Sequence, residues 1–138
     1  MHYNEITEKH LRRLSDKIKD VMSAKGLDNT GGTANSLEVN QTQLLADGNI
    51  YFLDQGRAPG TFPPVDAIRE WVRTKLGVTG SDEKGIAFLV GRKIKRDGTD
   101  IYRDKSKGIE LDSLIDDMLD GLMEELPNEV AAEALKWL

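Results

Sequence analysis

The chain has 138 residues, the length of one ordinary domain. It contains no cysteine, which excludes disulfide bonds, thiolate zinc sites and a cysteine nucleophile. Lysine and arginine number 19 against 24 aspartates and glutamates, and the resulting formal charge of -5 argues against general affinity for nucleic acid. No apolar run approaches the roughly 20 residues of a membrane-spanning helix, so we expect no membrane association.

The N-terminal part of the chain carries apolar residues at intervals of three and four positions. This spacing predicts an amphipathic helix over residues 4–25, ending at Gly26, since glycine suits the left-handed conformation past a helix end. The turn-forming residues at positions 28–33 predict a mobile loop. The expected buried face of the helix consists of Leu11, Leu14, Ile18, Val21 and Met22.

From Ser36 the pattern changes to an alternation of apolar and polar residues. This alternation, followed by Asp47-Gly48 and a second apolar run, predicts two strands joined by a tight Asp-Gly turn. The second run, at residues 50–54, is too short to show a period. It is therefore either extended or one helical turn.

Proline and glycine are concentrated at residues 55–64, which hold three of the four prolines. Because proline fixes the backbone φ angle, this segment is predicted to be a loop of restricted shape. A helix is predicted over residues 65–76, with Pro64 at its start and Gly77 after its end. The side expected to face the core carries Val65, Ile68, Trp71, Val72 and Leu76.

Another helix is predicted from Ser81 or Asp82, either of which can cap it, to about Arg96, with Gly98 as its stop. Its inward positions are expected to be Ile86, Leu89, Val90 and Ile94. A basic cluster near the C-terminal end comprises Arg92, Lys93, Lys95 and Arg96. Cations at this end favourably oppose the helix dipole, and the same side chains could contact DNA phosphates or an acidic partner.

The final third is predicted to be helical after a charged loop at residues 100–108. Residues 111–126 combine an apolar stripe two columns wide with acidic residues at the other positions. Pro127 ends or kinks this helix, and residues 128–138 can form a short terminal helix. The stripe consists of Leu111, Leu114, Ile115, Met118, Leu119, Leu122, Met123 and Leu126.

No group of residues predicts catalysis. The two histidines, His2 and His10, stand too far apart to share one helix face closely, and no Gly-x-Ser-x-Gly elbow or phosphate-binding glycine loop is present. Asp116, Asp120 and Glu124 are spaced by four residues and could line a magnesium site, but the stronger interpretation is the solvated face of a helix. We expect no enzyme activity, no catalytic or metal-binding residue and no cofactor.

These elements together predict an α+β fold, in which a small antiparallel hairpin is flanked by an N-terminal helix and several C-terminal helices. We expect one domain over residues 1–138. Residues 1–107 would form its core, and residues 108–138 an acidic helical extension.

Residues 51–64, followed by Ile68 to Trp71, Lys75 and Gly77, resemble a pattern in phage virion-morphogenesis proteins. In that pattern an aromatic-rich segment runs through Gly-Arg-x-Pro-Gly into Pro-Pro and then a helix with Ile-x-x-Trp. The resemblance covers about residues 37–99 and is most specific from Gly56 to Trp71. It is to tail-completion or head-to-tail joining (neck) proteins, which form rings and catalyse nothing.

The resemblance implies a structural component of a tailed phage or prophage particle, made in the host bacterial cytoplasm and built into the neck or tail of the virion. Its implied partners are further copies of the chain in a ring and other neck, portal-adaptor or tail proteins. Passing contact with genomic DNA is also implied, and a small-molecule substrate is not. The alternative hypothesis is a non-enzymatic interaction or regulatory module that binds a partner through its C-terminal helix.

Two sets of interface residues are expected. The resemblance implies a first set in the proline-glycine block and the helix after it, namely Gly56, Arg57, Pro59, Gly60, Pro63, Pro64 and Trp71. A second set follows from the C-terminal stripe, which is longer than one face of so small a domain readily covers, and comprises Met118, Leu122 and Met123. Trp71 is also expected to pack against the hairpin, so that Trp71→Ala would cost about 3–5 kcal/mol of stability. Arg57→Ala is expected to weaken assembly and leave the fold intact.

Overall fold

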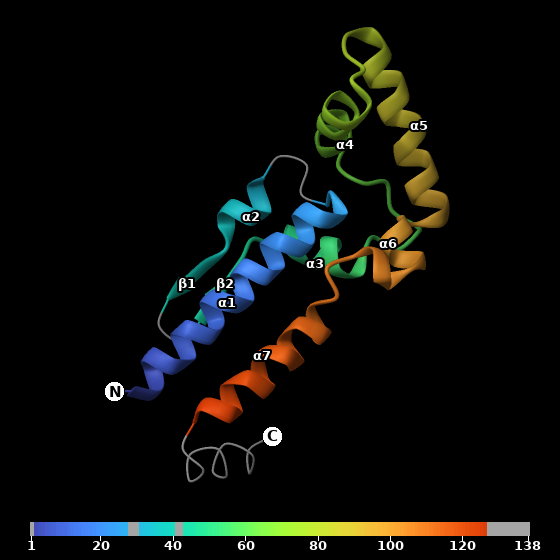
Figure 1. Ribbon diagram of the computed structural model, residues 1–138. Helices are drawn as coiled ribbons and strands as arrows, with labels where there is room; N and C mark the ends of the chain where they lie inside the picture. The colour runs from blue at the N-terminus through green and yellow to red at the C-terminus, as the bar shows by residue number, and fades with distance from the viewer. Residues whose placement is uncertain (1, 28–30, 41–42, 127–138) are drawn as a thin grey trace.

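Helix α1 (His2–Lys25) is the axis of one half of the molecule, the body (Figure 1). Helix α7 (Leu111–Glu125) and the two short strands β1 (Glu38–Asn40) and β2 (Gln43–Leu45) pack against it. The computed structural model describes residues 2–27, 31–40 and 43–126. Helices with one small antiparallel sheet confirm the α+β fold class.

The predicted hairpin is present, but both of its strands lie before Asp47-Gly48 in the chain. The strands pair Glu38 with Leu45, Val39 with Leu44 and Asn40 with Gln43, and the residues between them lie outside the described part. Asp47-Gly48 instead precedes helix α3 (Asn49–Gln55), where Asp47 Oδ1 accepts a hydrogen bond from Asn49 N at 3.2 Å. The predicted Asp-Gly hairpin turn is therefore wrong, because an aspartate can satisfy a free N–H at a helix start as well as in a turn. The apolar run at 50–54 is helical.

Part of the predicted mobile loop is a short helix, α2 (Gly32–Ser36). Thr33 is buried and its hydroxyl donates to Asp47 Oδ1 at 3.1 Å, while Ser36 Oγ accepts from Asp47 N at 2.9 Å. These contacts hold α2 against the start of α3. The loop prediction is therefore wrong for Gly32 and Thr33, and residues 28–30 lie outside the described part of the chain.

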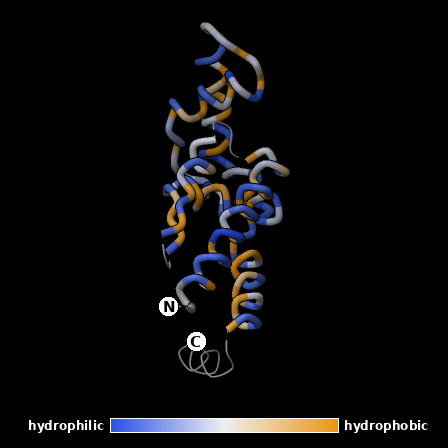
Figure 2. The backbone as a smooth tube through the Cα atoms, turned by 60° about the vertical axis from the view of Figure 1, so that its left-hand side comes forward, coloured by the Kyte–Doolittle hydropathy of each residue, from blue (hydrophilic) through white to orange (hydrophobic). Residues whose placement is uncertain are grey.

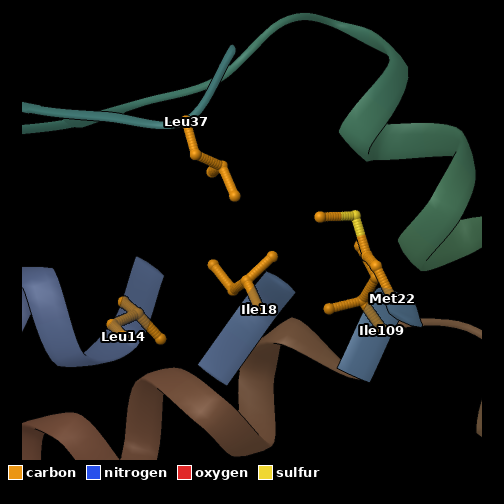
Figure 3. Close-up of a cluster of buried hydrophobic side chains, with 5 residues drawn as sticks. All are labelled: Leu14, Ile18, Met22, Leu37 and Ile109. Carbon is orange, nitrogen blue, oxygen red and sulfur yellow. The ribbon is translucent and has the colours of Figure 1, made fainter. Parts of the chain in front are cut away.

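The core of the body is built on one face of α1. The side chains that meet there are Leu14, Ile18, Met22, Leu37 and Ile109 (Figure 3). The first three are spaced by four residues, as the predicted amphipathic helix requires. Leu111, Leu114 and Met118 of α7 pack against this core. The expected division of the chain after residue 107 therefore does not separate a core from an extension, because Ile109 and α7 complete the core.

A second core lies in the other half of the molecule, the arm, which extends beyond the body in both views (Figures 1 and 2). The arm consists of α4 (Val65–Trp71), its π-helical continuation η1 (Val72–Leu76) and α5 (Ser81–Asp97). Ile68, Val72 and Ala87 are buried between these helices. Both predicted helices of this region are confirmed, with their stops at Gly77 and Gly98.

The apolar faces predicted for the arm helices are only partly correct. Val65, Trp71 and Leu76 are exposed, and so is Leu89, because α4 and α5 pack mainly on each other and cover only the facing stripes. Trp71 is 39% exposed and ends α4, a helix that lies in the arm, away from the hairpin (Figure 1). The prediction that it packs against the hairpin is wrong. The expected side-chain cap of α5 is also absent, since Gly80 occupies the cap position without a side-chain hydrogen bond.

The predicted charged loop at residues 100–108 is wound into two short turns, α6 (Asp100–Arg103) and η2 (Lys105–Lys107). Thr99 Oγ1 accepts from Tyr102 N at 3.4 Å, and Asp104 Oδ1 accepts from Ser106 N at 3.1 Å. Hydroxyl and carboxylate caps of this kind satisfy the free N–H groups of a first turn, which is why the segment is helical rather than irregular. None of the described helices has the length and apolar character that crossing a membrane requires.

Two glycines join the arm to the body in a contact that we call the clasp, formed by residues 56–57 and 98–99. Gly56 ends α3 at φ 76° and Gly98 ends α5 at the same φ. Arg57 N donates to Thr99 Oγ1 at 2.9 Å, and Thr99 N donates to Arg57 O at 3.0 Å. A Cβ on Gly56 would lie 2.3 Å from Tyr102 N, so no larger residue fits.

The end of α3 also sets the start of α7. Ile109 N donates to Leu53 O at 3.1 Å, and Leu111 N donates to Asp54 Oδ1 at 2.8 Å. Asp54 is buried, so its carboxylate satisfies a helix N–H that would otherwise lack a partner. Helix α3 is thus held to the arm by the clasp and to α7 by these two bonds.

We predict that Gly56→Ala lowers the free energy of unfolding by roughly 2–5 kcal/mol, because a side chain at this φ is strained and collides with the backbone of α6. Urea unfolding followed by circular dichroism measures the change. Gly85→Ala is the matched control, since its Cβ meets no atom within 4 Å and the residue is helical. There we expect a gain of about 0.5–1 kcal/mol. Equal changes in the free energy of unfolding at both positions would contradict the prediction that the clasp requires glycine at position 56.

An ion cluster joins the far ends of α1 and α7. Glu125 is bound by Lys9, and His10 Nε2 and Arg13 lie 3.2 Å and 3.7 Å from its Oε1. The hydrogen bond from Lys9, with smaller contributions from the charges of Lys9 and His10, lowers the pKa of Glu125 below its ordinary value of 4.5. A lowered pKa stabilises the folded chain above pH 4.5, and this contribution is lost as the pH falls through the folded-state pKa.

Glu125→Gln should therefore destabilise the chain at pH 7 and have no effect at a pH below the folded-state pKa of Glu125. Urea unfolding of both chains across this pH range measures the difference. Glu124→Gln is the control, since Glu124 is exposed and forms no ion pair with any described residue. A difference between wild type and Glu125→Gln that is independent of pH would refute the role of the ion cluster.

Candidate protein interface

The proline-glycine block, expected as an interface, is used largely within its own chain. Gly56 and Pro63 are buried, and Gly60 N donates to Lys95 O at 2.7 Å. The guanidinium of Arg57 stacks on the Phe52 ring at 3.8 Å. Pro59, Gly60 and Pro64 remain exposed. Gly56 and Pro63 are therefore not open to a partner, and the interface role of the other residues stays a prediction.

The outer face of α5 carries the most exposed of the large apolar side chains in the arm. Phe88 is 56% exposed and Leu89 is 63% exposed, one turn before the basic cluster. They line an open groove of about 810 Å³, whose other lining residues are Phe62, Arg92, Lys93, Lys95 and Arg96. Leu89, predicted to face inward, instead lies on this outer surface.

The floor of the groove depends on a close contact between a ring and a glycine. The Phe62 ring lies against Gly91, where a Cβ would be 2.3 Å from the ring. Phe62 also packs against Phe88, with ring centroids 5.9 Å apart. The absence of a side chain at Gly91 therefore allows an aromatic side chain from the proline-glycine block to extend the apolar surface of α5.

The basic cluster lies at the C-terminal end of α5, as predicted. Most of its cations form no ion pair with a described residue. Arg92 lies 6.0 Å from the centroid of the Phe88 ring, and Lys93 and Lys95 form no ion pair with any residue in the described ranges. Arg96 binds Asp97 at 2.9 Å. The hydrogen bond from Arg96 lowers the pKa of Asp97 from its ordinary value. Three cations thus stand beside Phe88 and Leu89.

A buried carboxylate fixes the two arm helices relative to each other. Glu83 of α5 is 4% exposed, and its Oε1 lies 3.0 Å from Arg69 Nε and 3.3 Å from Arg73 Nη1. Sequence reasoning missed this group. The available signal was the pair of arginines four residues apart, Arg69 on α4 and Arg73 on its continuation η1, which share one helix face.

The apolar stripe of the C-terminal helix α7 is less exposed than an interface surface was expected to be. Met118 packs against the core of its own chain, and Leu122 and Met123 are half-buried. Hydrophobic and hydrophilic residues alternate every few positions along α7 (Figure 2). The acidic residues Asp112, Asp116, Asp117, Asp120 and Glu124 are exposed.

The other candidate groups do not assemble into a reactive site. His10 is buried on α1 beside Gly121 of α7, and the side chain of His2 is outside the described part. Within the described ranges, no three histidine, aspartate or glutamate side chains come close enough to hold a metal ion. The predicted terminal helix at residues 128–138 also lies outside the described part.

The chain was compared with protein families, curated proteins and solved structures, and none of the three comparisons found a match.

We expect Glu83→Gln to lower the free energy of unfolding by about 1–3 kcal/mol, because it removes the charge that two arginines share. Thermal and urea unfolding measure this loss. Glu70→Gln is the matched control on the exposed side of α4 and should change the stability by less than about 0.5 kcal/mol. A Glu83→Gln chain as stable as wild type would show that the ion pairs do not hold the arm together.

Proposed function

We propose that this chain is a structural subunit of a tailed phage or prophage particle, acting in a ring at the head-tail neck or the top of the tail. The observation that carries the proposal is the outer face of α5, where Phe88 and Leu89 are exposed next to unpaired cations. The resemblance of residues 56–71 to tail-completion and neck proteins supports the same function from the sequence.

The outer face of α5 has two properties that suit an assembly contact. Large apolar side chains gathered on one surface are costly in water and typically mark a protein contact. Unpaired cations beside them add specificity for an acidic surface. The clasp and the prolines hold the arm in a fixed position before binding, so little ordering cost remains to be met on association.

The alternative hypothesis, a module that binds a partner through its C-terminal helix, has less support from the geometry. Met118 contacts the core of the chain, and Leu111 and Leu114 pack there too. Ile115, Leu119, Leu122 and Met123 are left for a partner, and only Ile115 of these is exposed rather than half-buried. The arm offers the larger exposed apolar surface.

Purified particles test the proposed function. The chain should be present in tailed particles at a constant ratio to the major tail protein, as measured by quantitative mass spectrometry. Antibody labelling in electron micrographs should place it at the head-tail junction. Complete, infectious particles that lack the chain would overturn the proposal.

Phe88→Ser should abolish incorporation into particles while leaving the monomer folded, because Phe88 is mostly exposed. Tyr51→Ser is the matched control, since Tyr51 is 62% exposed but lies on the body. We expect the control to incorporate at the wild-type ratio. Wild-type incorporation of a folded Phe88→Ser chain would show that the outer face of α5 is not used.

A further inference from the structure

We propose that the groove on α5 binds the acidic face of α7 from a second copy of this chain, so that the subunits associate head to tail. This inference deepens the proposed function and rests on it, because it names the contact by which a ring of these subunits would form. The groove is the receiving surface, and α7 is the occupant.

The groove presents two kinds of chemistry along one helix, apolar side chains at one end and cations at the other. Phe88, Arg92 and Arg96 follow one another at intervals of four residues, and Leu89 and Lys93 form the column beside them. An occupant therefore needs apolar side chains for one end of the groove and anions for the other. The lining residues of α5 run from Phe88 to Arg96, about 12 Å along the helix axis, so the occupant must be at least this long.

Helix α7 offers both kinds of side chain that the groove requires. Asp112, Asp116, Asp120 and Glu124 form a column at intervals of four residues, and none of them is ion-paired within the described part of the chain. Ile115, 37% exposed, and the half-buried Leu119 lie beside this column. The helix has 15 residues, or about 22 Å, so it is long enough to span the groove.

The two complementary helices cannot meet within one molecule. The arm that carries α5 lies at one end of the molecule, and α7 extends along α1 towards the other end (Figure 1). Their contact must therefore join two copies. Because the two surfaces are different, each copy keeps one of each kind free, and such a contact continues until it closes into a ring or extends as a filament.

An acidic helix fits this groove better than a nucleic acid does. A DNA backbone would neutralise Arg92, Lys93 and Lys95 but would leave Phe88 and Leu89 exposed to water. The chain also has a net charge of -5, which opposes approach of a polyanion. The acidic face of α7, which has apolar neighbours, covers both parts of the groove. The cations of the groove also offset the repulsion among the carboxylates of α7.

A charge-reversal exchange tests the contact. One variant, R92E/K93E, makes the groove acidic, and the other, D116K/D120K, makes the occupant basic. Each alone should weaken self-association by at least about 100-fold, because like charges then face each other. In an equal mixture every contact is again complementary, so assembly should return to within about tenfold of wild type. Sedimentation velocity measures all four samples.

Matched controls lie on α1. K17E/K19E has the same charge change as R92E/K93E, and D16K/D20K repeats both the charge change and the four-residue spacing of D116K/D120K. All four control positions are exposed. The controls should assemble like wild type, and circular dichroism should show that every variant is folded. Raising the salt concentration should weaken wild-type assembly, since the contact depends on exposed charges.

Three outcomes overturn the proposal: variants that assemble like wild type, a mixture that fails to restore assembly, and a wild-type chain that stays monomeric at all concentrations. A monomeric chain that binds duplex DNA in a gel-shift assay, and loses this binding in R92E/K93E, would assign the groove to nucleic acid instead. Failure of the exchange while particles still contain the chain refutes only the contact. Restored assembly with no chain in particles refutes only the proposed function.

Discussion

The clasp between the ends of α3 and α5 is the constraint on which the rest of the molecule depends. Gly56 and Gly98 allow the backbones to approach until Arg57 and Thr99 exchange two hydrogen bonds. A few residues away, Asp54 accepts the first N–H of α7, and Ile109 N binds Leu53 O. One short helix end therefore fixes the arm on one side and α7 on the other. Without the glycines, steric collision would separate the halves.

Two small cores follow from this arrangement. The body closes around Ile18 and Met22 of α1, while the arm closes around Val72 between α4 and α5. Because the arm helices cover mainly each other, their outer surfaces stay exposed, including Phe88 and Leu89. The rigid connection means that this surface is presented at a defined position relative to the body. A surface held in this way suits a subunit that has to be placed accurately among its neighbours.

The charge distribution is as asymmetric as the shape. Although the chain is acidic overall, cations without an ion partner among the described residues gather at the end of α5, and carboxylates of the same kind lie along α7. Charges that oppose the helix dipole account for the position of the basic cluster, but not for its place beside exposed aromatic rings. Association between different faces of identical chains would bring the two charge clusters together. It would also place the apolar edge of α7 over Phe88.

The sequence by itself determined the main helices, their stops at Gly77 and Gly98, and the amphipathic face of α1, because local periodicity and glycine conformation decide these features. Only the tertiary structure decided which apolar residues are covered. Leu89 and Trp71 have the helical spacing of core residues, yet they are exposed because the arm has a partner on one side only. Tertiary contacts also decided that Asp47-Gly48 precedes a helix rather than forming a hairpin turn. Asp47 accepts a hydrogen bond from Thr33 of α2, and local sequence does not specify that α2 packs there.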